Sequence, residues 1–206
     1  GTDANHDFNN VSVQTTYWED LRLPAGDMVI NGNLELFNSS LFIASNIYLK
    51  GDLNITGTMR AEGNTGDIIF SGSVPQTVNN TVAETDAVAE VQIASGAEVL
   101  LADPVTFSVT TIDSGGVLDL DGNNFTATGV FTNNGTLRLE GGETLTFSGA
   151  GGFDEDSGTV EFNGAGTYAG GLPNAFGDLF YNLTFDGAGG TWTLDANTSV
   201  TNDFTA

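Results

Sequence analysis

The sequence predicts an all-β protein, a single-stranded parallel β-helix (β-solenoid) with coils of about 19–25 residues. Three observations predict it: a regular internal repeat, apolar residues spaced two apart within it, and Gly or Asn between the apolar runs. Crossovers between parallel strands are overwhelmingly right-handed, so a right-handed coil is expected. The alternative is a β-sandwich or jelly roll with regularly spaced strands.

The repeat is clearest in three successive segments of equal length. They read IASGAEVLLADPVTFSVTT, IDSGGVLDLDGNNFTATGV and FTNNGTLRLEGGETLTFSG, and each begins where the one before it ends. Stacked coils would bury the aligned apolar residues one above another, about 4.8 Å apart within each column, and Gly or Asn would occupy corners that need positive φ. The aligned sets are Ile93, Ile112 and Phe131; Val99, Leu118 and Leu137; Leu101, Leu120 and Leu139; and, at the turn, Gly96, Gly115 and Asn134.

The remaining residues are assigned to an arm or to the solenoid by how closely they follow this repeat. Residues 1–28 are predicted to be an N-terminal arm, a cap, or a strand donated to a neighbour. Residues 29–206 are predicted to be the solenoid, with a lateral loop near 73–90. The first part of that solenoid has a shorter rhythm, in INGNLEL, IASNIYL and ITGTMRA, and two such units would make one coil of about 25 residues.

Composition excludes several classes of partner and site. The chain carries 27 acidic and 4 basic residues, a net charge of −23, which argues against nucleic acid and anionic membranes as partners. Without cysteine there are no disulfides or thiolate metal sites, and no apolar run reaches the ~18 residues of a membrane helix. A 39% hydrophobic fraction with 14 Phe is enough for a folded core.

Five stretches carry a family resemblance. The stretches SGSVPQTV, VQIASGAEVLLADPVTFSV and SGGVLDLDGNNFTATG resemble β-strand repeats of large microbial cell-surface proteins, as found in adhesins and autotransporter passenger solenoids. GTVEFNGAGTYAG and FYNLTFDGAGGTWTLDANTSVTNDF are similar to the same repeat type. The resemblance covers about 67–206 and implies an extracellular structural or adhesive protein, secreted or attached to a cell surface, with no catalytic residues to transfer.

Two acidic stretches are candidates for calcium. DLDGNN (119–124) has the D-x-D-G order found in calcium-binding loops, but the EF-hand spacing and the glycine-rich tandem spacing are absent. Its repeat partners are Arg138 for Asp119 and Glu140 for Asp121, so we expect Asp119 to face solvent and 121–124 to form a corner. In FDEDSG, Asp154, Glu155 and Asp156 are candidates for a weak structural Ca²⁺ site, and a solvated loop is the alternative. No other cofactor is expected.

Catalysis has little support. His6 is the only histidine, so Ser–His and Cys–His schemes find no motif, and a polysaccharide-active enzyme would have to use carboxylates with few basic neighbours. We expect no catalytic residues.

Ice binding by threonine ladders is a further alternative, from Thr126/Thr128, Thr144/Thr146 and Thr191/Thr193. However, Thr126 and Thr144 are one position closer in sequence than the aligned residues of successive repeats, so this ladder is out of step with the coil.

Eight Asn-x-Ser/Thr sequons are candidates for glycosylation in a host that modifies secreted proteins. The same pattern also suits a turn leading into a strand. The asparagines are Asn10, Asn38, Asn54, Asn79, Asn124, Asn134, Asn182 and Asn197.

The ends of the predicted solenoid are the most informative region for function. Val200 and Phe204 lie in a strand pattern that stops without a polar cap, and Phe8, Val11 and Val13 alternate in the N-terminal arm. These five residues are the predicted assembly residues. We expect a self-assembling extracellular filament or surface-layer subunit that stacks through β-edges on copies of itself. The alternative is an adhesin stalk or a module, within a longer protein, that binds glycans or another surface.

Overall fold

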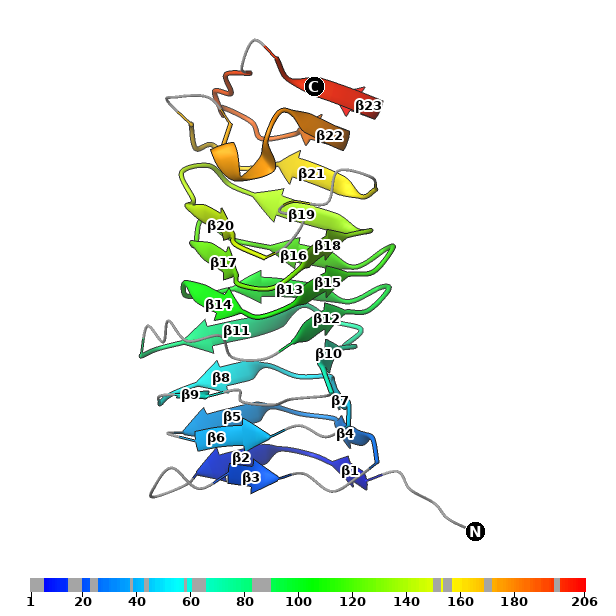
Figure 1. The fold of residues 1–206 in the computed structure, drawn as a ribbon, viewed down its shortest axis with the longest axis vertical. Coiled ribbons are helices and arrows are strands. Elements are labelled where there is room, and N and C mark those ends of the chain that lie inside the picture. The colour runs from blue at the N-terminus through cyan, green and yellow to red at the C-terminus, as the bar shows by residue number, and fades with distance from the viewer. Residues whose placement is uncertain are drawn as a thin grey trace.

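The structure is a computed structural model of the 206-residue chain. It describes residues 6–14, 20–22, 26–37, 39–42, 45–57, 59–60, 66–82, 90–149, 153, 157–168, 172–194 and 197–206. The coils stack into an elongated body with the first strands at one end and the last strands at the other (Figure 1). All strand pairs are parallel, and the described residues contain one short 3-10 helix, η1 (Asn174–Phe176). The predicted parallel β-solenoid is therefore confirmed, and the sandwich alternative is wrong.

The strands form four parallel sheets, which we name A to D. Sheet A contains β1 (His6–Phe8), β4 (Met28–Ile30), β7 (Ile47–Leu49), β10 (Ile68–Phe70), β12 (Val91–Ile93), β15 (Thr110–Ile112) and β18 (Phe131–Asn133). Sheet B contains β2 (Val11–Gln14), β5 (Leu34–Phe37), β8 (Leu53–Ile55), β11 (Gln76–Asn80), β13 (Glu98–Leu101), β16 (Val117–Asp119), β19 (Thr136–Leu139), β21 (Thr159–Phe162), β22 (Leu179–Phe185) and β23 (Ser199–Thr205). Sheet C contains β3 (Asp20–Arg22), β6 (Ser39–Phe42) and β9 (Met59–Arg60). Sheet D contains β14 (Val105–Phe107), β17 (Phe125–Ala127) and β20 (Leu145–Phe147).

The number of residues in each coil follows from the sequence separation of paired residues in sheet B. Asn33 and Asp52, which hydrogen-bond across two coils, are 19 residues apart, whereas Asp52 and Thr77, which bond across the next two, are 25 residues apart. The strand pairing has the same spacing, because Leu53 pairs with Leu34 on one side and with Val78 on the other. These pairings confirm the predicted range of coil lengths. Sheet B is also the only one of the four sheets whose strands run from the first described coil to the last.

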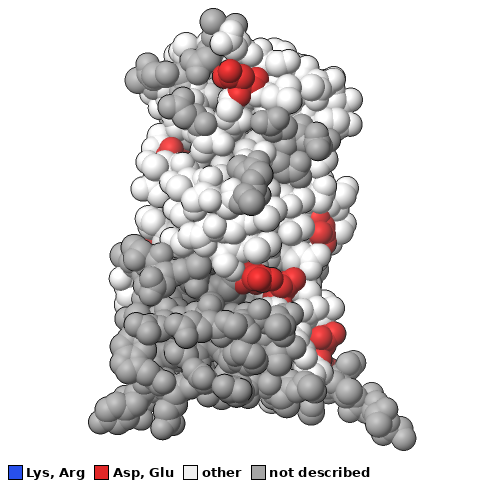
Figure 2. Space-filling view, viewed as in Figure 1, with Lys and Arg blue, Asp and Glu red and all other residues white. Residues whose placement is uncertain are grey.

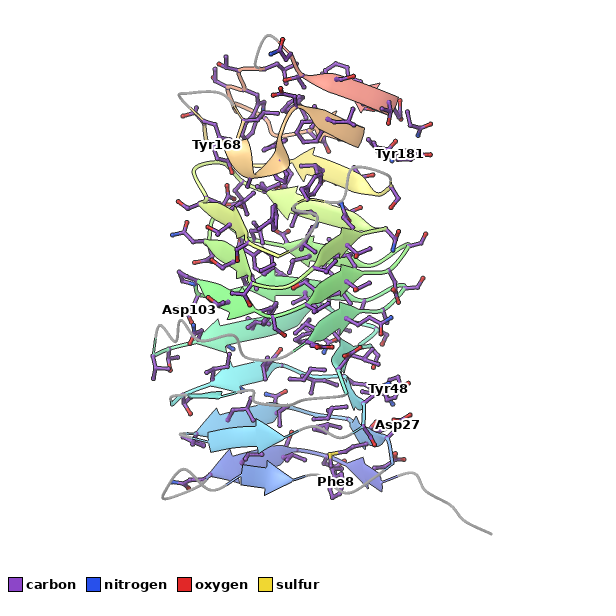
Figure 3. The ribbon with its side chains drawn as sticks, in the orientation of Figure 1. Phe8, Asp27, Tyr48, Asp103, Tyr168 and Tyr181 are labelled. Atoms are coloured by element: carbon purple, nitrogen blue, oxygen red, sulfur yellow. The ribbon has the colours of Figure 1, made fainter. Side chains whose placement is uncertain are left out.

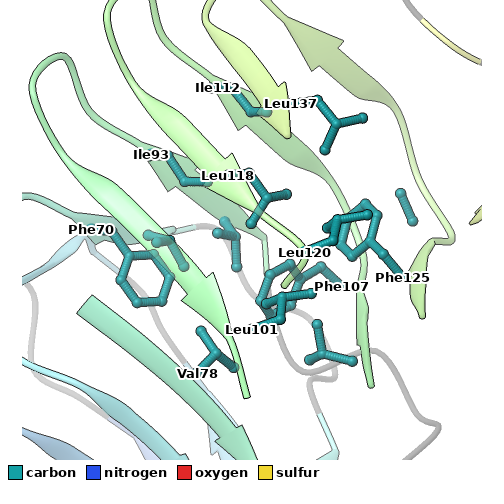
Figure 4. Close-up of a cluster of buried hydrophobic side chains, with 14 of the residues drawn as sticks. Phe70, Val78, Ile93, Leu101, Phe107, Ile112, Leu118, Leu120, Phe125 and Leu137 are labelled. Atoms are coloured by element: carbon teal, nitrogen blue, oxygen red, sulfur yellow. The ribbon is translucent and has the colours of Figure 1, made fainter. Parts of the chain in front are cut away.

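The core is built from columns of inward-facing side chains. Alternate residues of each strand point inward, so Val99, Leu118 and Leu137 pair in register, as the repeat predicted, and all three are fully buried. Figure 4 shows this stacking for Leu118 and Leu137 beside Leu101 and Leu120. Each coil therefore buries its apolar residues against its neighbours rather than within itself.

The repeat alignment is confirmed for Ile93 and Ile112 but is wrong for Phe131. Ile112 pairs with Asn133, and Phe131 pairs with Thr110, a shift of two residues. The cause is the turn before sheet B. Four residues, 113–116, link β15 to β16, whereas only two, 134–135, link β18 to β19. Gly96 and Gly115 share a positive-φ turn, but Asn134 does not have positive φ.

The predicted domain limits meet the strands as follows. In the segment 1–28, β1, β2 and β3 pair with β4, β5 and β6, so this segment supplies the first coil of the stack. Within the predicted lateral loop at 73–90, Gln76–Asn80 is a strand of sheet B, and 83–89 lie outside the described residues.

Two buried amides stand in the inward columns of β11. Gln76 accepts a hydrogen bond from the Gly72 N–H (2.6 Å) and donates to the carbonyl of Leu49. Asn80 donates to the carbonyl of Pro104 (2.8 Å). Both residues are at most 2% exposed. Because buried amides must be hydrogen-bonded, these contacts join the ends of β11 to the corners of the coils on either side.

Candidate functional site

One core column of sheet B is uncovered beyond β23 in the described part of the chain. One inward column of sheet B follows the strand register through Val99, Leu118, Leu137, Val160 and Leu183 to Phe204. Its inner members are 0–2% exposed, but Phe204 is 51% exposed. Phe204 therefore occupies a core position that has a coil on one side only, in the described part of the chain.

The strand that carries Phe204 is open in the same way. β23 pairs with β22, and none of the described strands lies on its other side. Of its seven residues only Val200 is partly buried, where it packs against the core. A parallel edge exposes unpaired N–H and C=O groups that accept a further strand. The edge and the exposed ring of Phe204 together form the C-terminal end surface.

The N-terminal end is better covered. Val13 is 5% exposed and belongs to the core, and Val11 packs against it from a half-buried position. Phe8, on β1, is 41% exposed at the lower end of the stack (Figure 3). Of the five predicted assembly residues, Phe8 and Phe204 are thus the two exposed ones, and they lie at opposite ends.

The acidic stretch that suggested a calcium loop is instead part of an ion-pair cluster. Asp119 and Glu161 flank Arg138 on neighbouring strands of sheet B. The guanidinium lies 3.2 Å from Asp119, 3.1 Å from Glu161 and 2.9 Å from Glu98. Burial by itself lowers the pKa of Arg138, but the hydrogen bond to Asp119 and the charges of Glu161 and Asp119 raise it above its ordinary value. Asp119 is only 9% exposed, so our expectation that it faces solvent is wrong, because Arg138 covers it.

The rest of DLDGNN is a corner, as expected. Asp121 (φ 46°) and Gly122 (φ 77°) both take left-handed backbone. The Asp119 carboxylate accepts the N–H of Asp121 (3.0 Å), and the Asn123 side chain donates to the carbonyl of Leu101 on the coil before (2.8 Å). These bonds use the polar groups to shape the turn.

Glu143 is the most buried carboxylate of the described residues, at 4% exposure. It accepts hydrogen bonds from the N–H groups of Glu140 (2.6 Å) and Gly141 (2.8 Å) and from the Tyr168 hydroxyl (2.5 Å). Burial raises the pKa of Tyr168, and the hydrogen bond to Glu143 raises it further. A hollow of about 230 Å³ lies beside this pair, but the carboxylate is fully engaged in holding the corner at 140–143.

The candidate calcium ligands Asp154, Glu155 and Asp156 lie outside the described residues. Elsewhere, in the residues that the structure does describe, no group of three or more His, Cys, Asp or Glu side chains is arranged to hold a metal. No helix in the described part is long and apolar enough to cross a membrane.

The sequon asparagines mainly join one coil to the next. Asn79 donates to Asn54 (2.7 Å), and Asn182 donates to the carbonyl of Gly158 (2.9 Å). Asn10, Asn124 and Asn134 use their side-chain oxygens to accept hydrogen bonds from neighbouring coils. Asn197 is exposed, and Asn38 lies outside the described residues. Coil-to-coil hydrogen bonding is thus a structural reason for the frequent Asn-x-Thr pattern.

Threonines form a ladder on sheet D in a register the sequence did not predict. Thr106 pairs with Thr126, and Thr126 pairs with Thr146 rather than with Thr144. The argument that the ladder is out of step is therefore wrong, because the coils of sheet D are slightly longer here than the aligned repeats. The ladder is nevertheless short, since sheet D has three strands and Thr106 is only 9% exposed.

Comparison of the chain with known protein families, with curated proteins and with solved structures finds no match. The parallel solenoid agrees with the resemblance to cell-surface repeats at the level of fold, and nothing among the comparisons supports a particular adhesin or autotransporter family.

Proposed function

We propose that this chain is a structural protein of the cell exterior, secreted or surface-attached, that stacks end to end with copies of itself into a filament or surface layer. The observation that carries the proposal is the C-terminal end surface. Phe204 completes a core column yet is 51% exposed, beside a strand edge with no described partner. A further coil, supplied by a second copy, would bury the ring and pair the edge.

Charge sets the conditions for such stacking. The net charge is −23, and the charged groups visible on the described part of the face in Figure 2 are acidic. Copies approaching end to end therefore repel one another at low ionic strength, and salt screens that repulsion over about 10 Å at 0.1 M. We expect assembly to require salt or divalent cations.

Electron microscopy and light scattering over a salt series test the proposal. We expect rods that lengthen with salt for the wild type, and monomers for Phe204→Lys, which places a charge on the edge. Val130→Lys is the matched control, because Val130 is 46% exposed on the side of the stack. Monomers of the wild type at every salt concentration, or rods that survive Phe204→Lys, would contradict the proposal.

A second candidate is a stalk or binding module within a longer cell-surface protein. The same open edge favours it, because continuing chain covers that edge as well as a second copy does. The full coding sequence distinguishes the two: solenoid repeats encoded directly after Ala206 would support the stalk and leave no free edge for a second copy.

A further inference from the structure

We propose that the outer face of sheet B carries a glycan-binding groove in its first three coils, with the Glu35 carboxylate as its central hydrogen-bond acceptor. The groove is a hollow of about 320 Å³. It is lined by Asn10, Val11, Ser12, Asn33, Glu35 and Asn54. The inference does not depend on end-to-end stacking, because the groove lies on the side of the solenoid.

The strand register explains how these side chains come together. Ser12, Glu35 and Asn54 are paired on three adjacent strands, so they form one outward row across β2, β5 and β8. Asn10 and Asn33 lie just before these strands and line the same hollow. Ser12 is short and Glu35 is long, so the row is hollowed over Ser12.

The amide oxygens of the groove are already used. Asn10 accepts the N–H of Asn33 (2.8 Å), and Asn33 accepts the N–H of Asp52 (2.9 Å). Asn54 accepts the side-chain amide of Asn79 (2.7 Å). The amide NH₂ groups of Asn10, Asn33 and Asn54 are left as donors at the groove, since no described residue accepts from them.

Glu35 differs from the other half-buried carboxylates of sheet B. Glu98 and Glu161 are both paired with Arg138. Within the described residues Glu35 has no hydrogen bond and no ion pair, although it is half-buried. Its carboxylate is therefore a free acceptor in a hollow among amide donors, available to a ligand that displaces water.

The donor set favours a sugar over a cation. Calcium takes six to eight oxygens, but the asparagine oxygens already accept hydrogen bonds, which leaves the carboxylate and the Ser12 hydroxyl. A polyol matches the groove, because its hydroxyls donate to Glu35 and accept from the asparagine amides. The net charge of −23 repels acidic sugars. The expected ligands are therefore neutral oligosaccharides with adjacent free hydroxyls.

The test is binding of the full chain to an array of neutral hexose and N-acetylhexosamine oligosaccharides, together with sialylated and sulfated ones. We expect binding confined to neutral glycans. Titration calorimetry with the bound oligosaccharide then compares variants. Glu35→Gln keeps the shape and removes the charged acceptor, so affinity should fall by at least about tenfold. Ser12→Tyr fills the hollow and should abolish binding.

Asp186→Asn is the matched control, since Asp186 is an exposed carboxylate outside the groove, and its affinity should equal that of the wild type. The proposal is overturned if no neutral glycan binds, if acidic glycans bind as well, or if Glu35→Gln binds unchanged. It is also overturned if CaCl₂ alone binds and Glu35→Gln removes that binding, because the groove would then be a cation site. Circular dichroism of each variant verifies that the fold is intact.

Discussion

The two halves of the stack bury different kinds of side chain. Up to Ile69 every buried apolar side chain among the described residues is aliphatic or Met, in columns such as Leu34–Leu53 and Ile30–Leu49. From Phe107 onward aromatic rings contact one another almost continuously to Phe204. The aromatic half also differs in its walls, because sheet A ends at β18 and sheet D at β20, while β21, β22 and β23 extend only sheet B.

The difference shows two ways to fill the core of a solenoid. Where several sheets surround the core, aliphatic residues repeated in register fill most of it, and rings enter it from β10 as Phe70, from β18 as Phe131, and from sheet D as Phe107 and Phe125. Where one sheet continues alone, bulkier rings bridge the wider and less regular space. Phe162 illustrates this, since it is fully buried and lies within 6.4 Å of the rings of four other aromatic residues.

The largest expected effect comes from removing that ring. Phe162→Ala should cost about 3–5 kcal/mol of unfolding free energy, the usual range for a buried aromatic residue. Because the described strands there belong to sheet B alone, we expect the loss to be local, with faster hydrogen exchange in β21, β22 and β23 and little change before β11. Mass spectrometry of exchanging amides measures it.

Leu53→Ala is the matched control in the aliphatic half, where the fully buried side chain stacks between Leu34 and Val78. We expect a loss of about 2–5 kcal/mol that spreads over all neighbouring coils. If both variants loosen the same strands, the two halves unfold as one unit and the comparison fails.

The second effect tests whether the Arg138 cluster stabilises the aromatic half, where Arg138 pairs with Glu98, Asp119 and Glu161. Arg138→Met leaves Glu98, Asp119 and Glu161 facing one another without a counter-ion. The Arg138 side chain is 23% exposed, so we expect a loss of about 2–4 kcal/mol in low salt, near the range for breaking a partly buried pair. Urea unfolding in low and high salt measures this.

Salt should recover part of the loss, because it screens the remaining repulsion. A triple variant, Arg138→Met with Asp119→Leu and Glu161→Leu, should recover more, since apolar replacements of a buried ion cluster are often neutral. An Arg138→Met variant as stable as the wild type would show that the cluster contributes nothing to the free energy of unfolding.

Sequence reasoning succeeded where the chain is regular. Identical apolar spacing in Val99, Leu118 and Leu137 predicts a coil, and the register follows from it. It was wrong for Phe131 because the turn after β18 is two residues shorter than the turn after β15. The strands of sheet B therefore keep the repeat spacing, while β18 in sheet A is shifted by two residues. It did not predict the Glu35 groove either, because Ser12, Glu35 and Asn54 become neighbours only through two coils of unequal length. Beyond the three repeats at 93–149 the even spacing is lost, since rings need no strict period to pack.

Acidification should raise the stability of the stack by a smaller amount. Burial raises the pKa of Glu140, and the charges of Asp121, Asp119 and Glu143 raise it further, above the ordinary 4.5. A raised folded-state pKa contributes stability that is fully present below about 4.5 and is lost as pH rises through the folded pKa. The thermal midpoint should therefore be higher at about pH 5 than at pH 8, and Glu140→Gln should flatten this dependence. A midpoint that falls between pH 8 and pH 5 would contradict the assignment.

The smallest effect concerns the asparagine hydrogen bonds, which both halves share. Asn33 accepts the N–H of Asp52 in the aliphatic half (2.9 Å), and Asn124 accepts the N–H of Thr144 in the aromatic half (2.7 Å). Each replacement by Ala should cost only about 0.5–1.5 kcal/mol, because the freed N–H groups lie near the surface, where water replaces the lost acceptor. Equal losses in urea unfolding would mean that these bonds join coils irrespective of the core beneath them. A clearly larger loss for Asn124→Ala would mean that the half with fewer walls depends on its outer hydrogen bonds as well as on its rings.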